Sequence, residues 1–174
     1  MQPDAGSPGN PAQLNAARVG VGYDSHRFAP GIPLVLGGVT IDSDIGLSGH
    51  SDGDAIAHAL TDAVLGAAAA GDIGEMFPDT AAVNKGRNSI EMLKLAVQAV
   101  EKKGWVVSSA DITVITEHPR IAPFRAEMRA VLSEALGTSL DSVSIKGKSN
   151  EGMGWIGSRE GLACIACATL VPKK

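Results

Sequence analysis

The stretch from Gly46 to Asp79 constrains the fold more than any other part of the sequence, because it combines an Ala-rich helical pattern with several ionisable side chains. Its pattern predicts a helix that begins after Ser51 or Asp52, since either side chain can accept a hydrogen bond from a first-turn N–H. The helix is predicted to run to about Ala70, and Gly71 is expected to end it.

The ionisable residues of this helix form one stripe. Asp54, His58 and Asp62 are spaced by four residues and therefore lie along one face. Nearly all the other positions of the helix are Ala, Leu, Ile or Val. This pattern predicts that the stripe is half-buried and paired. His50 lies just before the helix, and we expect it in a loop that faces a bound molecule.

A second set of candidate ligands follows the strand predicted at Arg18–Tyr23. Asp24 and His26 are two residues apart, so on an extended backbone both side chains point the same way. Alone, this pair is also compatible with a turn aspartate beside a surface histidine. Together with His58 it supplies two nitrogens and one oxygen, and three protein ligands with an open fourth position are typical of catalytic zinc. Asp54 is a candidate partner for the other ring nitrogen of His58.

Two further segments carry groups that suit phosphate. His50 and Ser51 offer an imidazole and N–H groups near a helix start. Lys148, Ser149 and Glu151 follow a predicted strand and offer a cation, a hydroxyl and a carboxylate, and the carboxylate can hold Mg²⁺ on phosphate oxygens. Together these groups predict a diphosphate site. No serine or cysteine nucleophile with a suitably spaced histidine base stands out, so we do not expect covalent catalysis.

The rest of the pattern predicts one α/β domain over residues 18–172, because strands and amphipathic helices are interleaved and such helices pack on a sheet. Residues 1–17 are rich in Pro, Gly, Ala and Asn and are predicted to be a flexible arm. The other predicted elements are a hairpin at 33–41 that turns at Gly37-Gly38, a helix from the cap Asn88 to Lys103, a strand at 110–116, a helix at 123–136, and strands at 143–148 and 162–171.

Composition limits the partners and the compartment. The net charge of −4 argues against nucleic acid or an anionic membrane as the main partner, and no apolar run reaches the roughly 20 residues of a membrane span. The only cysteines are Cys164 and Cys167, which fits a reducing compartment such as the cytoplasm. They are three apart in a predicted buried strand and point to opposite faces, so we interpret them as small core residues.

Five segments carry motifs that occur together: GYDSH at 22–26, LGGVTI at 36–41, GHSDGDAIAHALTDAVLGA at 49–67, GDIGEMFPDT at 71–80, and the SNEGMGWIG loop that follows residue 148. In these motifs the chain resembles the 2-C-methyl-D-erythritol 2,4-cyclodiphosphate synthase family. The order of the D-x-H, HSDGD-x3-H and GDIG-x2-FPD segments is highly specific to it. The resemblance extends from Arg18 to about Val171.

The resemblance implies a phosphorus–oxygen lyase of the non-mevalonate isoprenoid pathway. Family members convert 4-diphosphocytidyl-2-C-methyl-D-erythritol 2-phosphate into the 2,4-cyclodiphosphate and CMP by attack of the 2-phosphate on the β-phosphorus. Because the attacking group is already an anion, the enzyme has to position it and stabilise charge. The resemblance implies one Zn²⁺ per subunit on Asp24, His26 and His58, and Mg²⁺ or Mn²⁺ on Glu151 with the substrate diphosphate.

Further residue roles and an assembly follow from the same resemblance. His50 and Ser149 match positions that stabilise the transition state. The subunit is expected to be α/β (α+β) and ferredoxin-like, with one β-sheet covered by helices, and to form a homotrimer with active sites between subunits. The cytidine diphosphate substrate is expected to contact Asp24, Ser25, His26, His50, Ser51, Asp72, Ile73, Gly74, Phe77, Pro78, Asp79, Thr80, Ala81, Thr116, Glu117, His118, Pro119, Arg120, Ile121, Ala122, Lys148, Ser149, Asn150, Glu151, Trp155 and Arg159.

The chain departs from the family pattern at four places. Ser149 stands where Thr is usual and keeps the hydroxyl, and Ala81 stands where Asp is common. Arg159 is displaced by one residue, and the expected cytosine loop carries Glu117-His118 and Arg120 in place of smaller residues and Lys.

Two other hypotheses use the same groups. One is a zinc-dependent phosphohydrolase, in which the metal ligands act on water. The other is a non-catalytic module that binds CDP-like or isoprenoid diphosphate ligands.

Overall fold

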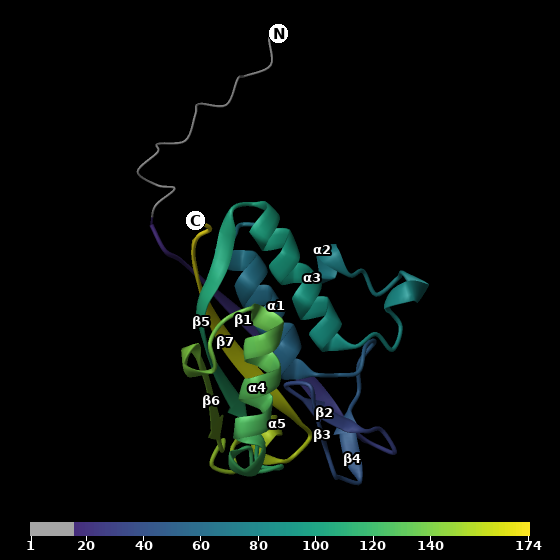
Figure 1. Cartoon of the computed structure of the whole chain (residues 1–174). Coiled ribbons are helices and arrows are strands. Elements are labelled where there is room, and N and C mark those ends of the chain that lie inside the picture. The colour runs from purple at the N-terminus through teal and green to yellow at the C-terminus, as the bar shows by residue number, and fades with distance from the viewer. Residues whose placement is uncertain (1–15) are drawn as a thin grey trace.

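A five-stranded sheet forms the centre of the molecule in a computed structural model that describes residues 16–174 (Figure 1). Neighbouring strands in this sheet are antiparallel, except for β5 and β6, which are parallel. A separate two-stranded sheet turns at Gly37 and Gly38, whose φ angles of 57° and 75° suit a tight hairpin. In spatial order the main sheet contains β4 (Ile45–Leu47), β1 (Arg18–Pro30), β7 (Gly161–Pro172), β5 (Trp105–Ile115) and β6 (Val143–Lys148), and the small sheet contains β2 (Leu34–Leu36) and β3 (Val39–Ile41).

Three long helices form a layer on one face of the main sheet (Figure 1). They are α1 (Ala55–Ala67), α3 (Ser89–Lys102) and α4 (Arg125–Leu136). The core lies between them and the sheet, with Leu60, Leu93 and Leu132 fully buried. Burying each such side chain contributes about 1.5–3 kcal/mol. The short elements are α2 (Ile73–Met76), α5 (Gly154–Gly157) and the 3₁₀ turns η2 (Ala82–Asn84), η3 (Ala122–Phe124) and η4 (Leu140–Ser142).

On the opposite face of the sheet, the part formed by β1 and β7 carries exposed apolar side chains. Val19, Val21 and Tyr23 alternate along β1 and are each more than half exposed, at 62%, 67% and 56%. Ile165 on the neighbouring β7 pairs with Tyr23 and is also exposed. An aliphatic and aromatic patch of this kind is typical of a surface that another protein covers.

Most predicted elements are present. In α3 the side chain of Asn88 accepts a hydrogen bond from the Glu91 N–H, and Gly137 ends α4 in the left-handed conformation. The prediction for β1 was too short, because the strand continues to Pro30, and β5 begins five residues earlier than predicted, at Trp105. Strand β4 was not predicted, and three residues are too few to give a periodic signal.

The predicted start of α1 was wrong. The helix begins at Ala55, and its cap is Asp54 in place of Ser51 or Asp52. The Asp54 carboxylate accepts from the N–H groups of Ile56 and Ala57. It also accepts from Gly37 and Gly38 in the hairpin, at 2.8 and 2.7 Å, so one buried side chain joins the hairpin to the helix. The helix ends at Ala67, three residues before the predicted end.

The ferredoxin-like expectation is also corrected. Ferredoxin-like domains follow the order β-α-β-β-α-β, whereas the main elements here follow β-α-α-β-α-β-β. Helix α4 connects β5 to β6, and these two parallel strands are direct neighbours in the sheet. No other strand lies between them. The mixed α+β class and the helix-covered sheet are confirmed.

The predicted N-terminal arm lies almost wholly outside the described residues, which begin at Ala16. Within the part of the chain that the structure describes, no helix has the length and apolar character needed to cross a membrane.

Candidate active site

The structure brings together Asp24 and His26 from β1 with His58 from α1. Asp24 Oδ2 lies 2.9 Å from His26 Nδ1 and 3.0 Å from His58 Nδ1. One possible ligand atom from each residue lies within 4.8 Å of the other two. The D-x-H pair therefore meets the helical histidine as predicted. All three residues are only partly buried, so the cluster is open to a bound molecule.

Glycines in β1 allow this meeting. Gly20 and Gly22 lie on the same face of the strand as Asp24, and both are in close contact with α1. A Cβ atom at Gly22 would lie only 1.9 Å from the carbonyl oxygen of Ala59, so the helix rests directly on the strand backbone. His58 precedes Ala59, and the close approach brings its ring to Asp24.

The donor set fits a divalent metal. Within residues 16–174, His26 Nδ1 is buried and has no properly aligned hydrogen bond, although it lies 2.9 Å from the Asp24 carboxylate. A buried nitrogen of this kind needs another partner. Two imidazole nitrogens and one carboxylate oxygen suit Zn²⁺ and similar cations, and three ligands leave a position for a substrate atom.

The electrostatics of the cluster favour positive charge. Burial opposes ionisation of Asp24, but hydrogen bonds and charge from His26 and His58 outweigh it and lower its pKa from 3.8 to about 2. Burial also disfavours the charged form of His58, yet the hydrogen bond and charge of Asp24, with the charges of Asp54 and Asp52, raise the pKa of that ring. A metal cation at this point would take the place of these protons.

The expected role of Asp54 as the partner of His58 was wrong, because its carboxylate faces the hairpin and the first turn of α1. Two hydroxyls occupy that place: Ser51 Oγ and Ser89 Oγ each lie 2.8 Å from His58 Nε2. Sequence reasoning missed Ser89, which is 31 residues away along the chain. Asp62, the third member of the stripe, accepts a hydrogen bond from the Ile73 N–H and tethers α2.

A cavity of about 400 Å³ adjoins His26 and His58. The loop before α1 supplies His50, whose carbonyl oxygen accepts a hydrogen bond from the Gly86 N–H at 2.8 Å. Asp72 does not line the cavity, because its carboxylate caps α2 through the Glu75 N–H. Thr80 and Ala81 also lie outside the lining, whereas Asn84 and Met92 belong to it and were not predicted. The remaining lining residues are Ser51, Ile73, Gly74, Phe77, Pro78 and Asp79.

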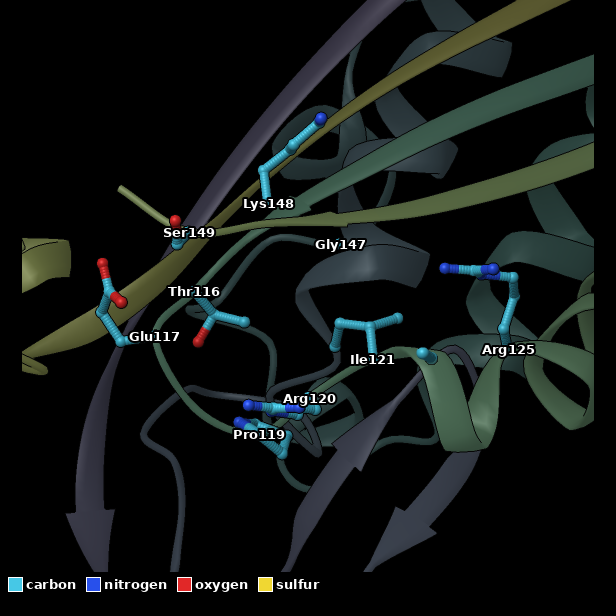
Figure 2. A pocket seen from close by; sticks show the side chains of 10 residues that line it. Thr116, Glu117, Pro119, Arg120, Ile121, Arg125, Gly147, Lys148 and Ser149 are labelled. Carbon is cyan, nitrogen blue, oxygen red and sulfur yellow. The ribbon is translucent and has the colours of Figure 1, made fainter. Parts of the chain in front are cut away.

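A second pocket lies where the parallel strands β5 and β6 end (Figure 2). It contains three cations, Arg120, Arg125 and Lys148, and none of them forms an ion pair in the described part of the chain. Arg125 was not predicted, and His118 is exposed and outside the lining. The other lining residues are Thr116, Glu117, Pro119, Ile121, Ala122, Gly147 and Ser149.

The loop beside this pocket is held by carboxylates. Glu117 Oε1 accepts from the N–H groups of Asn150 and Gly152, at 2.9 and 3.1 Å. The Ser149 hydroxyl donates to Glu151 Oε1 at 2.5 Å. These contacts hold residues 149–152, the segment that carries Ser149 and Glu151, two of the residues predicted to act on phosphate.

Three predicted residues lie elsewhere. Ser25 and Trp155 border a smaller pocket that His26 also lines. Arg159 is exposed in the turn after α5, with a φ of 60°, and lines none of these three pockets. Within one chain, the cavity beside the metal ligands and the cationic pocket share no lining residue.

The profile of the YgbB family matches residues 17–171, which include every strand and helix of the site. The chain belongs to the YgbB family.

Two kinds of relatives of this YgbB family member are informative. The 2-C-methyl-D-erythritol 2,4-cyclodiphosphate synthase of Gemmatimonas aurantiaca is 59% identical over 154 residues, which are 88% of this chain and 93% of that protein. Among solved structures, the bifunctional IspDF of Campylobacter jejuni aligns with a TM-score of 0.88 and 39% identity over 91% of this chain and 43% of that one. The CDP complex of Plasmodium falciparum IspF aligns with a TM-score of 0.81 and 35% identity over 92% and 99%.

Proposed function

We propose that this chain is a 2-C-methyl-D-erythritol 2,4-cyclodiphosphate synthase, a phosphorus–oxygen lyase of isoprenoid biosynthesis. It converts 4-diphosphocytidyl-2-C-methyl-D-erythritol 2-phosphate into the cyclic diphosphate and CMP. The observation that carries the proposal is the Asp24–His26–His58 donor cluster beside the His50 cavity, in a chain that is 59% identical to a relative of that name.

Two metal sites belong to the proposal. A zinc ion held by Asp24, His26 and His58 supplies a Lewis acid for phosphate oxygens. Glu151 is proposed to hold Mg²⁺ or Mn²⁺ with the substrate diphosphate, because Mg²⁺ in phosphate sites typically takes only one or two protein carboxylates.

The remaining groups position the reacting phosphates. His50 lies beside the metal ligands on a loop that a backbone hydrogen bond holds in place, so its imidazole can donate to a phosphate oxygen. The Ser149 hydroxyl now donates to Glu151, and it can turn to the substrate when Glu151 takes a cation. Lys148 and Arg120, which form no ion pair with another described residue, can neutralise negative charge on the substrate. Preorganised donors of this kind are the main source of stabilisation in phosphoryl transfer.

The two pockets are assigned to the two ends of the substrate. The cavity lined by Ile73, Gly74 and Phe77 is proposed to hold the methylerythritol end. The pocket formed by residues 116–122 and Lys148 is proposed to hold the cytidine end, and the CDP complex of the Plasmodium falciparum relative supports a cytidine nucleotide as ligand.

The assembly is proposed to be a homotrimer whose active sites combine the metal cluster of one chain with the cytidine pocket of its neighbour. Two observations support it: the two pockets share no residue, and the apolar face with Val21, Tyr23 and Ile165 requires a cover. The free cysteines Cys164 and Cys167 support a reducing location such as the cytoplasm.

Sedimentation equilibrium tests the assembly. We expect a mass three times the 17.8 kDa of one chain. Val21→Asp places a charge in the apolar patch and is expected to shift the protein toward the monomer, because a buried unpaired carboxylate is costly. A monomeric wild-type protein would contradict the trimer.

The reaction is tested by ³¹P NMR on the purified protein with the cytidyl substrate, Zn²⁺ and Mg²⁺. We expect signals of the cyclic diphosphate and of CMP. CMP together with a linear phosphate product would show that water attacks and would favour the phosphohydrolase. Tight CDP binding without turnover would favour the binding module.

A further inference from the structure

Ser89 is a fully buried residue that contacts a proposed metal ligand and has no role in the mechanism above. It is the first residue of α3, and its hydroxyl oxygen lies 2.8 Å from His58 Nε2. The other ring nitrogen of His58 faces Asp24 at 3.0 Å. The ring therefore lies between the metal cluster and a serine on a different helix.

The direction of the serine hydroxyl is fixed by Asp52. The carboxylate of Asp52 accepts the Ser89 backbone N–H through Oδ2 at 2.9 Å and the Ser89 hydroxyl through Oδ1. An ionised carboxylate is an acceptor only, and a serine hydroxyl has one proton to donate. Since that proton goes to Asp52, Ser89 Oγ presents a lone pair to His58.

Ser51 supports the same hydrogen-bond direction at His58 Nε2. Its hydroxyl oxygen lies 2.8 Å from His58 Nε2 and 3.3 Å from Ser89 Oγ, and it accepts from the Gly53 N–H. Its own proton can go to Ser89 Oγ. His58 Nε2 then faces two acceptor oxygens and must itself be the donor.

We propose that Ser89, oriented by Asp52, is a positioning residue that holds His58 with its proton on Nε2 and its lone pair on Nδ1 directed at the metal. The inference rests on the proposed metal site and adds a group that determines its affinity. Outer hydrogen-bond partners of this type typically change metal affinity by 10–100-fold. The sequence predicted that the Asp54 carboxylate would bind His58 directly. In the structure Ser89 binds this ring, and the Asp52 carboxylate orients Ser89.

The test is the Zn²⁺ affinity of the purified full-length protein, measured by competition with a chromophoric chelator without substrate. Ser89→Ala is expected to weaken Zn²⁺ binding by at least tenfold. The Asp52 Oδ2 contact to the backbone of residue 89 does not need the serine side chain, so we expect α3 to keep its start. Ser133→Ala is the matched control, because Ser133 is also buried in a helix and, among the described residues, its hydroxyl bonds only the Ala130 carbonyl.

A second variant separates the hydrogen-bond direction from packing. In Asp52→Asn one of the two carboxylate oxygens becomes an NH₂ donor. The residue can then no longer accept both the backbone N–H and the hydroxyl of Ser89. We expect a loss of Zn²⁺ affinity similar to that of Ser89→Ala, and near wild-type affinity in Ser89→Thr, which keeps the hydroxyl.

The outcomes are distinguishable. Affinities of Ser89→Ala and Asp52→Asn within twofold of Ser133→Ala would overturn the role of Ser89 and leave the metal site intact. A wild-type protein that binds no Zn²⁺ would overturn the metal site itself. In the Zn²⁺-loaded wild type, a slowly exchanging imidazole proton on His58 Nε2 should appear in ¹H–¹⁵N spectra, and it should exchange faster in Ser89→Ala, where Ser51 is the remaining acceptor.

Discussion

Replacing His58 with alanine is expected to lower the rate of cyclisation by a factor on the order of 10³ and to abolish stoichiometric zinc binding. His58 is the ligand that joins α1 to the β1 pair, and Asp24 and His26 alone leave an incomplete set. A Lewis-acid metal supplies several kcal/mol of transition-state stabilisation, and each 1.36 kcal/mol corresponds to a factor of ten. CMP release followed by ³¹P NMR measures the rate, and metal analysis of the same sample measures the zinc.

His50→Ala is the informative comparison for this prediction. His50 lines the same cavity but does not belong to the donor cluster. We therefore expect it to retain zinc at wild-type stoichiometry while turnover falls, by about 10²-fold for the loss of one preorganised donor. If His58→Ala kept both its zinc and a rate within tenfold of wild type, the proposed metal role of this residue would be wrong.

The local parts of this site were predictable from the sequence. Asp24 and His26 share a strand face, and His58 stands on a helix with almost no other polar residues, so short-range periodicity indicated three candidate ligands. The cap of α3 and the C-terminal ends of α3 and α4 were predictable for the same reason, whereas α4 begins at Arg125, two residues after the predicted start, because residues 122–124 form a 3₁₀ turn. Asn88, Gly104 and Gly137 act on their own helix termini.

The parts that depend on contacts distant in sequence were not predictable. The pattern S-D-G-D offers several possible helix caps, and Asp54 is selected because it also binds the hairpin at Gly37 and Gly38. With Asp54 engaged there, His58 takes Ser89, which α3 supplies from another part of the chain. Arg125 was missed because its position in the cationic pocket depends on how α4 follows η3, and no short motif encodes that arrangement.

The contact between β1 and α1 could not be predicted from the sequence pattern either. Residues 18–23 indicated only a strand, and nothing in that segment shows which face a helix covers. In the structure, Gly20 and Gly22 take the covered face while Val19, Val21 and Tyr23 take the exposed one. The metal cluster therefore depends on Gly20 and Gly22 as well as on its ligands, because these glycines let α1 approach β1.

Gly22→Ala is accordingly expected to destabilise the protein by about 3 kcal/mol and to weaken Zn²⁺ binding. The added Cβ would lie 1.9 Å from the carbonyl oxygen of Ala59 and 2.8 Å from the amide nitrogen of Ala63, and both are helix backbone atoms that cannot turn aside. Overpacking in a tight core typically costs 1–3 kcal/mol, and here α1 has to move away from β1, which carries His58 away from Asp24. Urea unfolding at one fixed protein concentration measures the loss, since the stability of an oligomer depends on concentration.

Gly66→Ala is the same chemical change, but we do not expect it to destabilise the protein. Gly66 lies in the last turn of α1 and is exposed, and no atom of the described residues lies within 4 Å of a Cβ placed there. Alanine is favoured over glycine by about 0.8–1.0 kcal/mol in a helix interior and by less near its end, so this variant should be as stable as wild type or slightly more stable, and should keep its zinc. If Gly22→Ala lowered the unfolding midpoint no more than Gly66→Ala does, the Cβ added at residue 22 would not be forcing α1 away from β1. The direct contact of α1 with β1 would then not be what holds the metal ligands together.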